Sequence, residues 1–395
     1  MTSERLTGQP DQAPAIAWSE AQGAPRLRRQ APGLRFGGRR AWAYASGLVA
    51  ARFGRLLDAS ALAELLEMDD AGERLARVRQ TTLGTDLSPA RGWLEIGTEL
   101  DGAFNERAAE LGRACPDATA VDFFGLQEEC RLLKRYAKSR LKPPEGEEPG
   151  AGPGVSGDEL ETVWGGAQIG PGRGSRFGWE AALAQAEGLR QEVREGRPPT
   201  PGPAAWLVDL TFDGVLLRAE SALAEEIAWR WGGDKVAEVI RGWVELQCLL
   251  VVARARRWPG RLPIVRQYFG MPVGEADWLT ALYESEGIDA AAGRLAWQNA
   301  LQGALGGALM ADQAKAGPRG EGADAEEAQW LARRGDEVLM EQVRAVRWIP
   351  FGPEPVFGYL WGLRTEADNL KAVVGGLQAG VAPEAIREQL RPTYV

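Results

Sequence analysis

The sequence predicts an all-α protein, and three observations support this prediction. Apolar residues recur at helical spacing along most of the chain, as they do between Asp122 and Leu141. Alternating runs of Val, Ile and Thr, which are typical of strands, are scarce. Segments rich in Pro and Gly separate the helical stretches, and neither residue type favours a helix interior.

Helical spacing begins near residue 41. The preceding segment, 1–40, is rich in Pro, Gly, Gln, Ser and Arg, and we expect a disordered tail there. Its basic part, RLRRQAPGLRFGGRR (Arg26–Arg40), either contacts an acidic lipid or protein or remains solvated. After it, apolar spacing predicts one helix from Tyr44 to Leu57 and a second one beyond, for which Asp58 or Ser60 is the expected N-cap.

Two longer amphipathic stretches follow, from Trp93 to Leu111 and from Asp122 to Leu141. The second places its apolar residues three or four positions apart, on one face of a helix. These residues are Phe123, Leu126, Cys130, Leu133, Ala137 and Leu141. Cations cluster at its end, where they either complement the helix dipole or form a basic docking patch.

Four Pro- and Gly-rich breaks divide the rest of the chain into units of a size typical of compact lobes. The breaks are Lys142–Gly157, Gln168–Gly178, Arg197–Pro203 and Lys315–Glu327. We therefore predict a tail at 1–40, a first helical lobe at 41–142, a Gly/Pro-rich linker region at 143–178, a second lobe at 179–265 and a third lobe at 266–395.

Composition argues against catalysis and against several kinds of ligand. The chain of 395 residues contains no histidine, which excludes Ser-His-Asp, Cys-His and histidine-based metal sites. The Gly-rich stretch Gly170–Gly174 lacks the lysine of a phosphate-binding loop. Adjacent acids at Asp69–Asp70 and at Glu128–Glu129 point to different sides of a helix. We expect no catalytic residue, no bound cofactor and no metal.

Charge and cysteine content narrow the class of partner and the compartment. The net charge of −9 disfavours nucleic acid as the main partner. No apolar run is long enough to span a membrane. Three cysteines (Cys115, Cys130 and Cys248) form no CxxC pair, and the last two lie in apolar helical patterns. We expect these two to be small buried hydrophobes in a reducing compartment, rather than reactive thiols.

A short pattern recurs three times at nearly equal intervals. DFFGLQ, ELQCLL and EADNLK each have an acid at position i, a small or polar residue at i+3 and Leu at i+4, and their starts lie 123 and 121 residues apart. The residues are Asp122, Gly125 and Leu126, then Glu245, Cys248 and Leu249, then Glu366, Asn369 and Leu370. We interpret this pattern as three related lobes, although plain core packing also explains it.

A second marker supports the repeat. An acid that opens an amphipathic helix precedes each copy, at Asp101, Asp213 and Asp336. In the repeated motif itself, the small residue at i+3 would allow a neighbouring helix to approach closely.

The last part of the chain is similar to a known family. The stretch Pro350–Leu390 contains Gly352 and Glu354, a Tyr359-Leu360 pair, the core Glu366-x-x-Asn369-Leu370-Lys371 and a final Ile386-Arg387-x-x-Leu390 helix. It closely resembles the end of the C subunit, also called the d subunit, of V/A-type rotary ATPases. Ala43–Leu57 resembles the first helix of that family, and Val239–Arg256 resembles its second repeat. The family's repeated asparagine is Gly125 and Cys248 in the first two copies.

The resemblance implies three pseudo-threefold-related helical bundles that form a funnel. It also implies a non-catalytic rotor part on the cytoplasmic face of the membrane, which couples the D and F proteins of the central stalk to the proteolipid ring during ion transport or ATP synthesis. We expect the three motif helices to line or back the cavity that holds the stalk. The alternative is a divergent paralogue that acts as a helical scaffold in another assembly.

Overall fold

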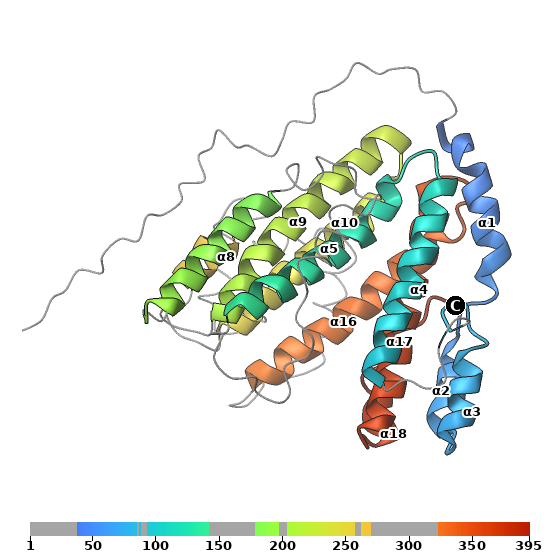
Figure 1. The fold of residues 1–395 in the computed structure, drawn as a ribbon. Coiled ribbons are helices and arrows are strands. Elements are labelled where there is room, and N and C mark those ends of the chain that lie inside the picture. Colours follow the sequence, from blue (N-terminus) through green and yellow to red (C-terminus); the bar gives the residue numbers. More distant parts are fainter. Residues whose placement is uncertain are drawn as a thin grey trace, which may run out of the picture. The chain divides into compact units, whose positions relative to one another are not determined.

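The computed structural model describes residues 38–84, 87, 93–141, 178–196, 204–256, 262–269 and 323–395. Every regular element in these ranges is a helix, which confirms the predicted all-α class (Figure 1). The short elements are the 3₁₀ helix η2 (Gly38–Trp42) and helices α1 (Ala43–Phe53), α2 (Ala59–Glu67), α3 (Ala71–Val78), α8 (Trp179–Arg194), α11 (Leu262–Phe269) and α18 (Pro383–Arg387). The long helices are α4 (Trp93–Ala114), α5 (Thr119–Leu141), α9 (Ala204–Trp231), α10 (Asp234–Arg256), α16 (Ala323–Val346) and α17 (Pro353–Gln378).

The six long helices form three consecutive pairs, namely α4 with α5, α9 with α10, and α16 with α17. Only a few residues connect the two helices of a pair. Gly232 ends α9 with a positive φ of 62°, a conformation that glycine adopts without strain, and Asp234 then starts α10. Each of the three repeated motifs lies on the second helix of a pair, that is on α5, α10 or α17.

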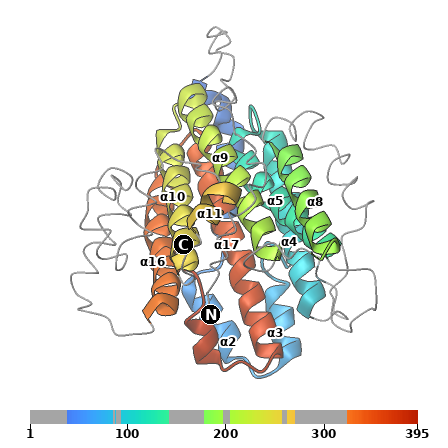
Figure 2. The ribbon, with the colours of Figure 1, turned by 90° about the vertical axis from the view of Figure 1, so that its left-hand side faces the viewer.

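The three pairs contact one another in a closed cycle. The second helix of each pair packs against the first helix of the next, α5 against α9 and α10 against α16, and α17 returns to α4. Helix α17 also contacts α5 and α10, so it lies between helices of the two other pairs (Figure 2). This order explains why α17 is apolar on nearly all sides, with Val356, Leu360 and Leu363 fully buried.

Local sequence explains how the first helices begin. Asp58 is the N-cap of α2, and its side chain accepts a hydrogen bond of 2.8 Å from the backbone N–H of Ala61. The prediction of an N-cap at Asp58 or Ser60 is thereby confirmed for Asp58. In the same way Asp70 caps α3 by accepting from the N–H of Glu73.

The predicted apolar face of α5 is buried except at its end, where Leu141 is half-buried. Phe123, Leu126, Cys130, Leu133 and Ala137 are at most 6% exposed. Each large apolar side chain that is removed from water in this way contributes on the order of 1.5–3 kcal/mol to folding. This face meets α9 and α17, so it forms part of the core that joins the pairs.

Cations near the end of α5 are paired with acids of α9. Lys138 donates a 2.7 Å hydrogen bond to Asp209, and Lys134 pairs with Asp213. These lysines therefore link two helix pairs, a contact that neither the dipole explanation nor the docking-patch explanation includes.

The domain boundaries remain predictions, because much of what separates the lobes lies outside the described residues. The linker region at 143–178 falls there except for Gly178, which precedes α8. The tail does too, except that Gly38–Arg40 belong to η2. Among the described residues, no helix is both long and apolar enough to cross a membrane.

Candidate functional site

The three motif helices meet at a cluster of aromatic side chains, which we call the aromatic junction. It consists of Phe123 and Phe124 from α5, Trp243 from α10, and Phe357 and Trp361 from α17. The Trp361 ring is central, since its centroid lies 5.8 Å from that of Phe123, 5.7 Å from that of Trp243 and 5.7 Å from that of Phe357. Offset and edge-to-face ring pairs at such distances each add about 0.5–1.5 kcal/mol beyond the burial of their area.

The aromatic junction fills the space where the three helices meet. Phe123 and Phe357 are at most 1% exposed, and Phe104 of α4 extends the cluster with its centroid 5.8 Å from that of Phe124. Because the junction fills this space, a cavity lined by these three helices would have to lie farther along their length. The role of the motif helices in a cavity therefore stays a prediction.

In the first copy of the motif, Leu126 is buried and Asp122 is half-buried. Gly125 is exposed, and a Cβ atom built on it would meet nothing within 4 Å. The small residue of this copy thus brings no neighbouring helix close, contrary to the reason we gave for it.

In the second copy, Cys248 and Leu249 are buried and Glu245 is half-buried. Burial raises the pKa of Glu245 to about 7, although the cation of Arg241 opposes this rise. Burial also raises the pKa of Cys248 and of Cys130, so both thiols are protonated and behave as small hydrophobes, as the sequence predicts.

Helices α10 and α16 approach each other closely at two other glycines, which the motif analysis missed. A Cβ atom on Gly242 would lie 3.1 Å from the Leu339 side chain, and one on Gly335 would lie 2.5 Å from the Leu246 side chain. Gly335 directly precedes the marker acid Asp336. The sequence does not reveal its close contact, because this contact depends on which helix packs against it.

In the third copy, Glu366 and Asn369 hold two other segments of the chain. Glu366 is 4% exposed, and its carboxylate accepts a 2.9 Å hydrogen bond from the backbone N–H of Leu57 in the connection between α1 and α2. Burial raises the pKa of Glu366 to about 7. Asn369 donates to the carbonyl oxygen of Arg391 at 3.0 Å and accepts from the Arg391 N–H at 2.8 Å. It thus fixes the C-terminal segment.

The remaining motif residues of α17 are also in contact with the core or with acids. Leu370, Tyr359 and Leu360 are fully buried, and burial raises the pKa of Tyr359 to about 12. Lys371 forms ion pairs of 2.9 Å with Asp101 and 2.8 Å with Asp368. The acids of the three copies differ in burial, because Glu366 is buried whereas Asp122 and Glu245 are half-buried.

The marker acids lie in the interiors of α4, α9 and α16, so the prediction that each of them opens a helix is wrong. All three are paired with cations. Asp101 of α4 pairs with Arg364 of α17 at 3.0 Å as well as with Lys371, and Asp213 of α9 pairs with Lys134 of α5. Asp336 of α16 pairs with Arg391 at 3.3 Å. The first two of these bridges join one helix pair to another, so the marker acids support the cycle of contacts.

A further acid is buried beside the aromatic junction. Glu220 of α9 is 0% exposed, and the Gln127 side chain of α5 donates to its Oε1 at 3.0 Å. Burial raises the pKa of Glu220 to about 8, which the hydrogen bond from Gln127 only partly offsets. The sequence does not single out this residue. An acid within an apolar helix can be recognised as buried only when the positions of the neighbouring helices are known.

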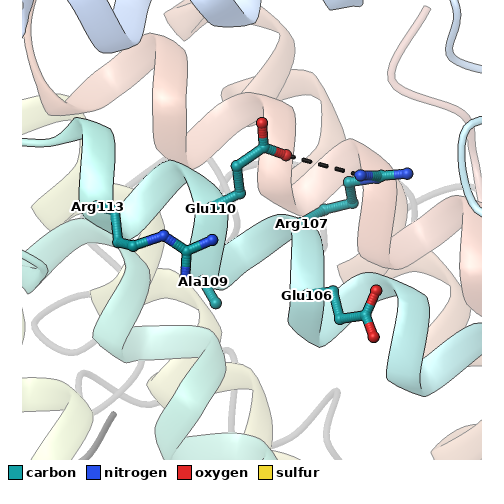
Figure 3. Close-up of a pocket in the computed structure, with 5 residues that line it drawn as sticks. All are labelled: Glu106, Arg107, Ala109, Glu110 and Arg113. Atoms are coloured by element: carbon teal, nitrogen blue, oxygen red, sulfur yellow. Dashed lines mark ion pairs between the residues drawn. The ribbon is translucent and has the colours of Figure 1, made fainter.

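A shallow pocket of about 350 Å³ lies on the surface of α4. Its lining is Glu106, Arg107, Ala109, Glu110 and Arg113 (Figure 3). Arg52 of α1 donates a 3.0 Å hydrogen bond to Glu110, and this bond lowers the pKa of the Glu110 carboxyl. All five lining residues lie on one face of α4, and Arg107 forms an ion pair of 3.7 Å with Glu110 within the pocket. No cluster of potential metal ligands occurs among the described residues.

Part of the chain is similar to a known protein family. The model of the ATP synthase (C/AC39) subunit family matches residues 230–389, a range that includes α10, α16 and α17 with the second and third motif copies. A search of curated proteins found no significant match. The family match confirms the resemblance that the C-terminal motifs indicate.

Proposed function

We propose that this relative of the ATP synthase (C/AC39) subunit is a non-catalytic coupler in a V/A-type ATPase, which connects the central stalk to the membrane rotor ring. In this role the chain binds the D and F proteins of the stalk on one side and the proteolipid ring on the other. It lies on the cytoplasmic face of the membrane and transmits torque during ATP-driven ion transport or ion-driven ATP synthesis. No bond is made or broken in it.

The single observation that carries this proposal is the closed cycle of contacts among three helix pairs. A part that transmits torque must not shear internally, and shear is resisted when each pair is held from both sides. The aromatic junction adds close packing where α5, α10 and α17 meet. A pseudo-threefold funnel around the stalk is the arrangement that the family resemblance implies for these pairs.

Polar bridges between pairs support the same role. Asp213 is bonded to Lys134 across the first and second pairs, and Asp101 is bonded to Arg364 and Lys371 across the first and third. Such bridges have a fixed geometry, so they resist the sliding of one helix along another more than apolar contacts do.

The alternative of a scaffold in another assembly rests on the long N-terminal tail and on the missing asparagines at Gly125 and Cys248. Asn369 binds the backbone of the C-terminal segment, whereas Gly125 is exposed with open space around it and Cys248 is buried. The environments of the three positions therefore differ, and the missing asparagines alone do not favour the scaffold.

Binding tests the partner assignment. The full-length chain, mixed with the purified D–F stalk at micromolar concentration, is expected to elute with it as one complex in size-exclusion chromatography. Separate elution of a folded chain would refute the coupler and favour the scaffold.

Coupling tests the mechanical part. Lys134→Met removes the bridge to Asp213 and keeps the length of the side chain, while Lys235→Met removes only an exposed pair within α10. In the reconstituted ATPase, we expect Lys134→Met to lower ion transport per ATP hydrolysed and Lys235→Met to leave it unchanged. Equal coupling in both variants, with both chains bound in the complex, would contradict a role for this bridge in torque transmission.

A further inference from the structure

The connections within the second and third helix pairs are bonded to the same arginine. Arg39 of η2 donates from its Nε to the carbonyl oxygen of Phe351 and from one Nη to that of Gly232, both at 3.0 Å. Its other Nη pairs with Glu354 at 2.8 Å. Gly232 lies between α9 and α10, Phe351 lies between α16 and α17, and Glu354 belongs to the first turn of α17. One side chain therefore joins two helix pairs at the ends where each pair turns.

Trp42 of η2 adds an apolar contact to the second pair. Its ring is 0% exposed, and the ring centroid lies 5.5 Å from that of Trp231, edge to face, at the end of α9. Trp231 in turn donates from its Nε1 to Asp117, in the connection between α4 and α5, at 2.8 Å. The connection of the first pair is thus reached through Trp231. We call Arg39 and Trp42 the clasp.

Two glycines let the second and third pairs meet beside the clasp. A Cβ atom on Gly233 would lie 2.8 Å from the side chain of Pro353, and one on Gly352 would lie 2.8 Å from the Arg39 guanidinium. Gly352 also has a positive φ of 136°, which favours glycine. Both glycines are buried. The two connections therefore approach each other closely at the place where Arg39 is bonded to both.

The clasp is small and lies partly at the surface. The 3₁₀ helix η2 has five residues, too few to be stable on its own. The Arg39 side chain is 41% exposed, so water competes for its hydrogen bonds. By contrast, α9 and α10 are held by fully buried residues such as Ile227 and Val236. Release of the clasp therefore breaks few interactions and leaves the long helices intact.

We propose that η2 is a releasable clasp across the second and third helix pairs. While Arg39 is bonded to both connections, they are held against each other. When η2 detaches, the two connections separate in one local opening step, and the long helices stay folded. This device is a property of the chain without any partner, so it goes beyond the proposed function and does not depend on it.

Amide hydrogen exchange of the full-length chain, followed by mass spectrometry, tests the proposal. Arg39→Gln removes the cation that pairs with Glu354 and shortens the side chain. We expect peptides that cover residues 228–236 and 347–356 to exchange roughly tenfold faster in this variant, and peptides of α5 to keep their rates. Both connections contain amides whose protection can be followed, because the N–H groups of Gly232 and Ile349 are hydrogen-bonded to backbone carbonyl oxygens.

Arg40→Gln is the matched control, because Arg40 is the next residue of η2 and is exposed. It is expected to exchange like the unmodified chain. The proposal is overturned if Arg39→Gln exchanges like the unmodified chain, or if only one of the two connections exchanges faster. Equal acceleration in all peptides, those of α5 included, would also overturn it, since η2 would then open only together with the whole fold.

A distance measurement tests the separation directly and does not require the Arg39 variant to fold. Spin labels are attached at Trp229→Cys and Phe351→Cys, whose native side chains are 56% and 48% exposed, in a chain that also carries Cys115→Ser. Cys130 and Cys248 are buried. We expect a main distance and a minor, longer one, and the longer distance becomes more populated in Arg39→Gln. A single distance in the chain with native Arg39, under conditions in which its connections exchange, would refute the separation.

Discussion

Glu220 makes the stability of this protein depend on pH in a direction that is unusual for a glutamate. Its carboxyl lies fully buried on α9 and accepts a hydrogen bond from Gln127, and no ion pair of Glu220 occurs among the described residues. Burial disfavours the charged form and raises the pKa from 4.5 to about 8. We therefore predict that Glu220→Gln, which imitates the protonated acid, removes a large part of the loss of stability on going from acidic to alkaline pH.

The sign follows from proton binding. Between pH 4.5 and pH 8 the folded protein keeps the proton on Glu220, whereas the unfolded chain releases it. The free energy of unfolding therefore falls as the pH rises through this range, by about 1.4 kcal/mol per pH unit. The full shift corresponds to roughly 5 kcal/mol, which is fully present below pH 4.5 and lost above about pH 8.

Urea unfolding of the unmodified chain and of Glu220→Gln, at a series of pH values between these limits, measures the difference. Glu245 and Glu366 also have raised pKa values, but their contribution cancels when the two proteins are compared. Glu225→Gln on the same helix, where the side chain is exposed, is the control and is expected to follow the unmodified chain. A constant difference between the unmodified chain and Glu220→Gln over the whole pH range would refute the reasoning.

Three further predictions concern stability. Asn369→Ala removes both hydrogen bonds to the C-terminal segment; we expect a loss of about 2–3 kcal/mol and faster amide exchange in residues 391–395, while unchanged exchange would contradict the role of Asn369. Gly358→Ala places a Cβ atom 2.5 Å from a buried tyrosine hydroxyl and is expected to lower the thermal midpoint, at a cost of about 1–3 kcal/mol. Gly125→Ala, on an open helix face, is its matched control and is expected to stabilise by about 0.5–1 kcal/mol, so a similar effect of both would disprove the packing argument. Arg39→Ala leaves the carboxyl of Glu354 buried without its cation; we expect a loss of about 1–2 kcal/mol in urea unfolding that grows with pH, and a loss independent of pH would count against the pairing.

The sequence predicted what depends on local spacing. The apolar face of α5 from Phe123 to Ala137 is buried as expected, and Asp58 caps α2. Both follow from the period of the helix and from the free N–H groups at its start, which need no knowledge of the neighbours. The C-terminal motifs likewise indicated the family that matches residues 230–389.

Residues whose role depends on a distant partner were missed. Gly125 was expected to admit a neighbouring helix, but close approach occurs at Gly242 and Gly335, since these two positions face side chains of the opposite helix. In the same way, Arg39 was assigned to a disordered tail, although its partners Gly232 and Phe351 lie 193 and 312 residues away. Spacing along one helix contains no information about which surface lies opposite.

The cycle of contacts also limits how this architecture can change in size. A linear array of repeats gains or loses a unit at its ends, where capping repeats shield the last surface from water. Here α17 packs against α4, so among the described helices the last pair is joined to the first. Insertion of a fourth helix pair would have to open an existing interface and replace it with two new ones. Deletion of a helix pair would expose the apolar faces of its two neighbouring pairs, and these faces pack against different helices in the intact protein.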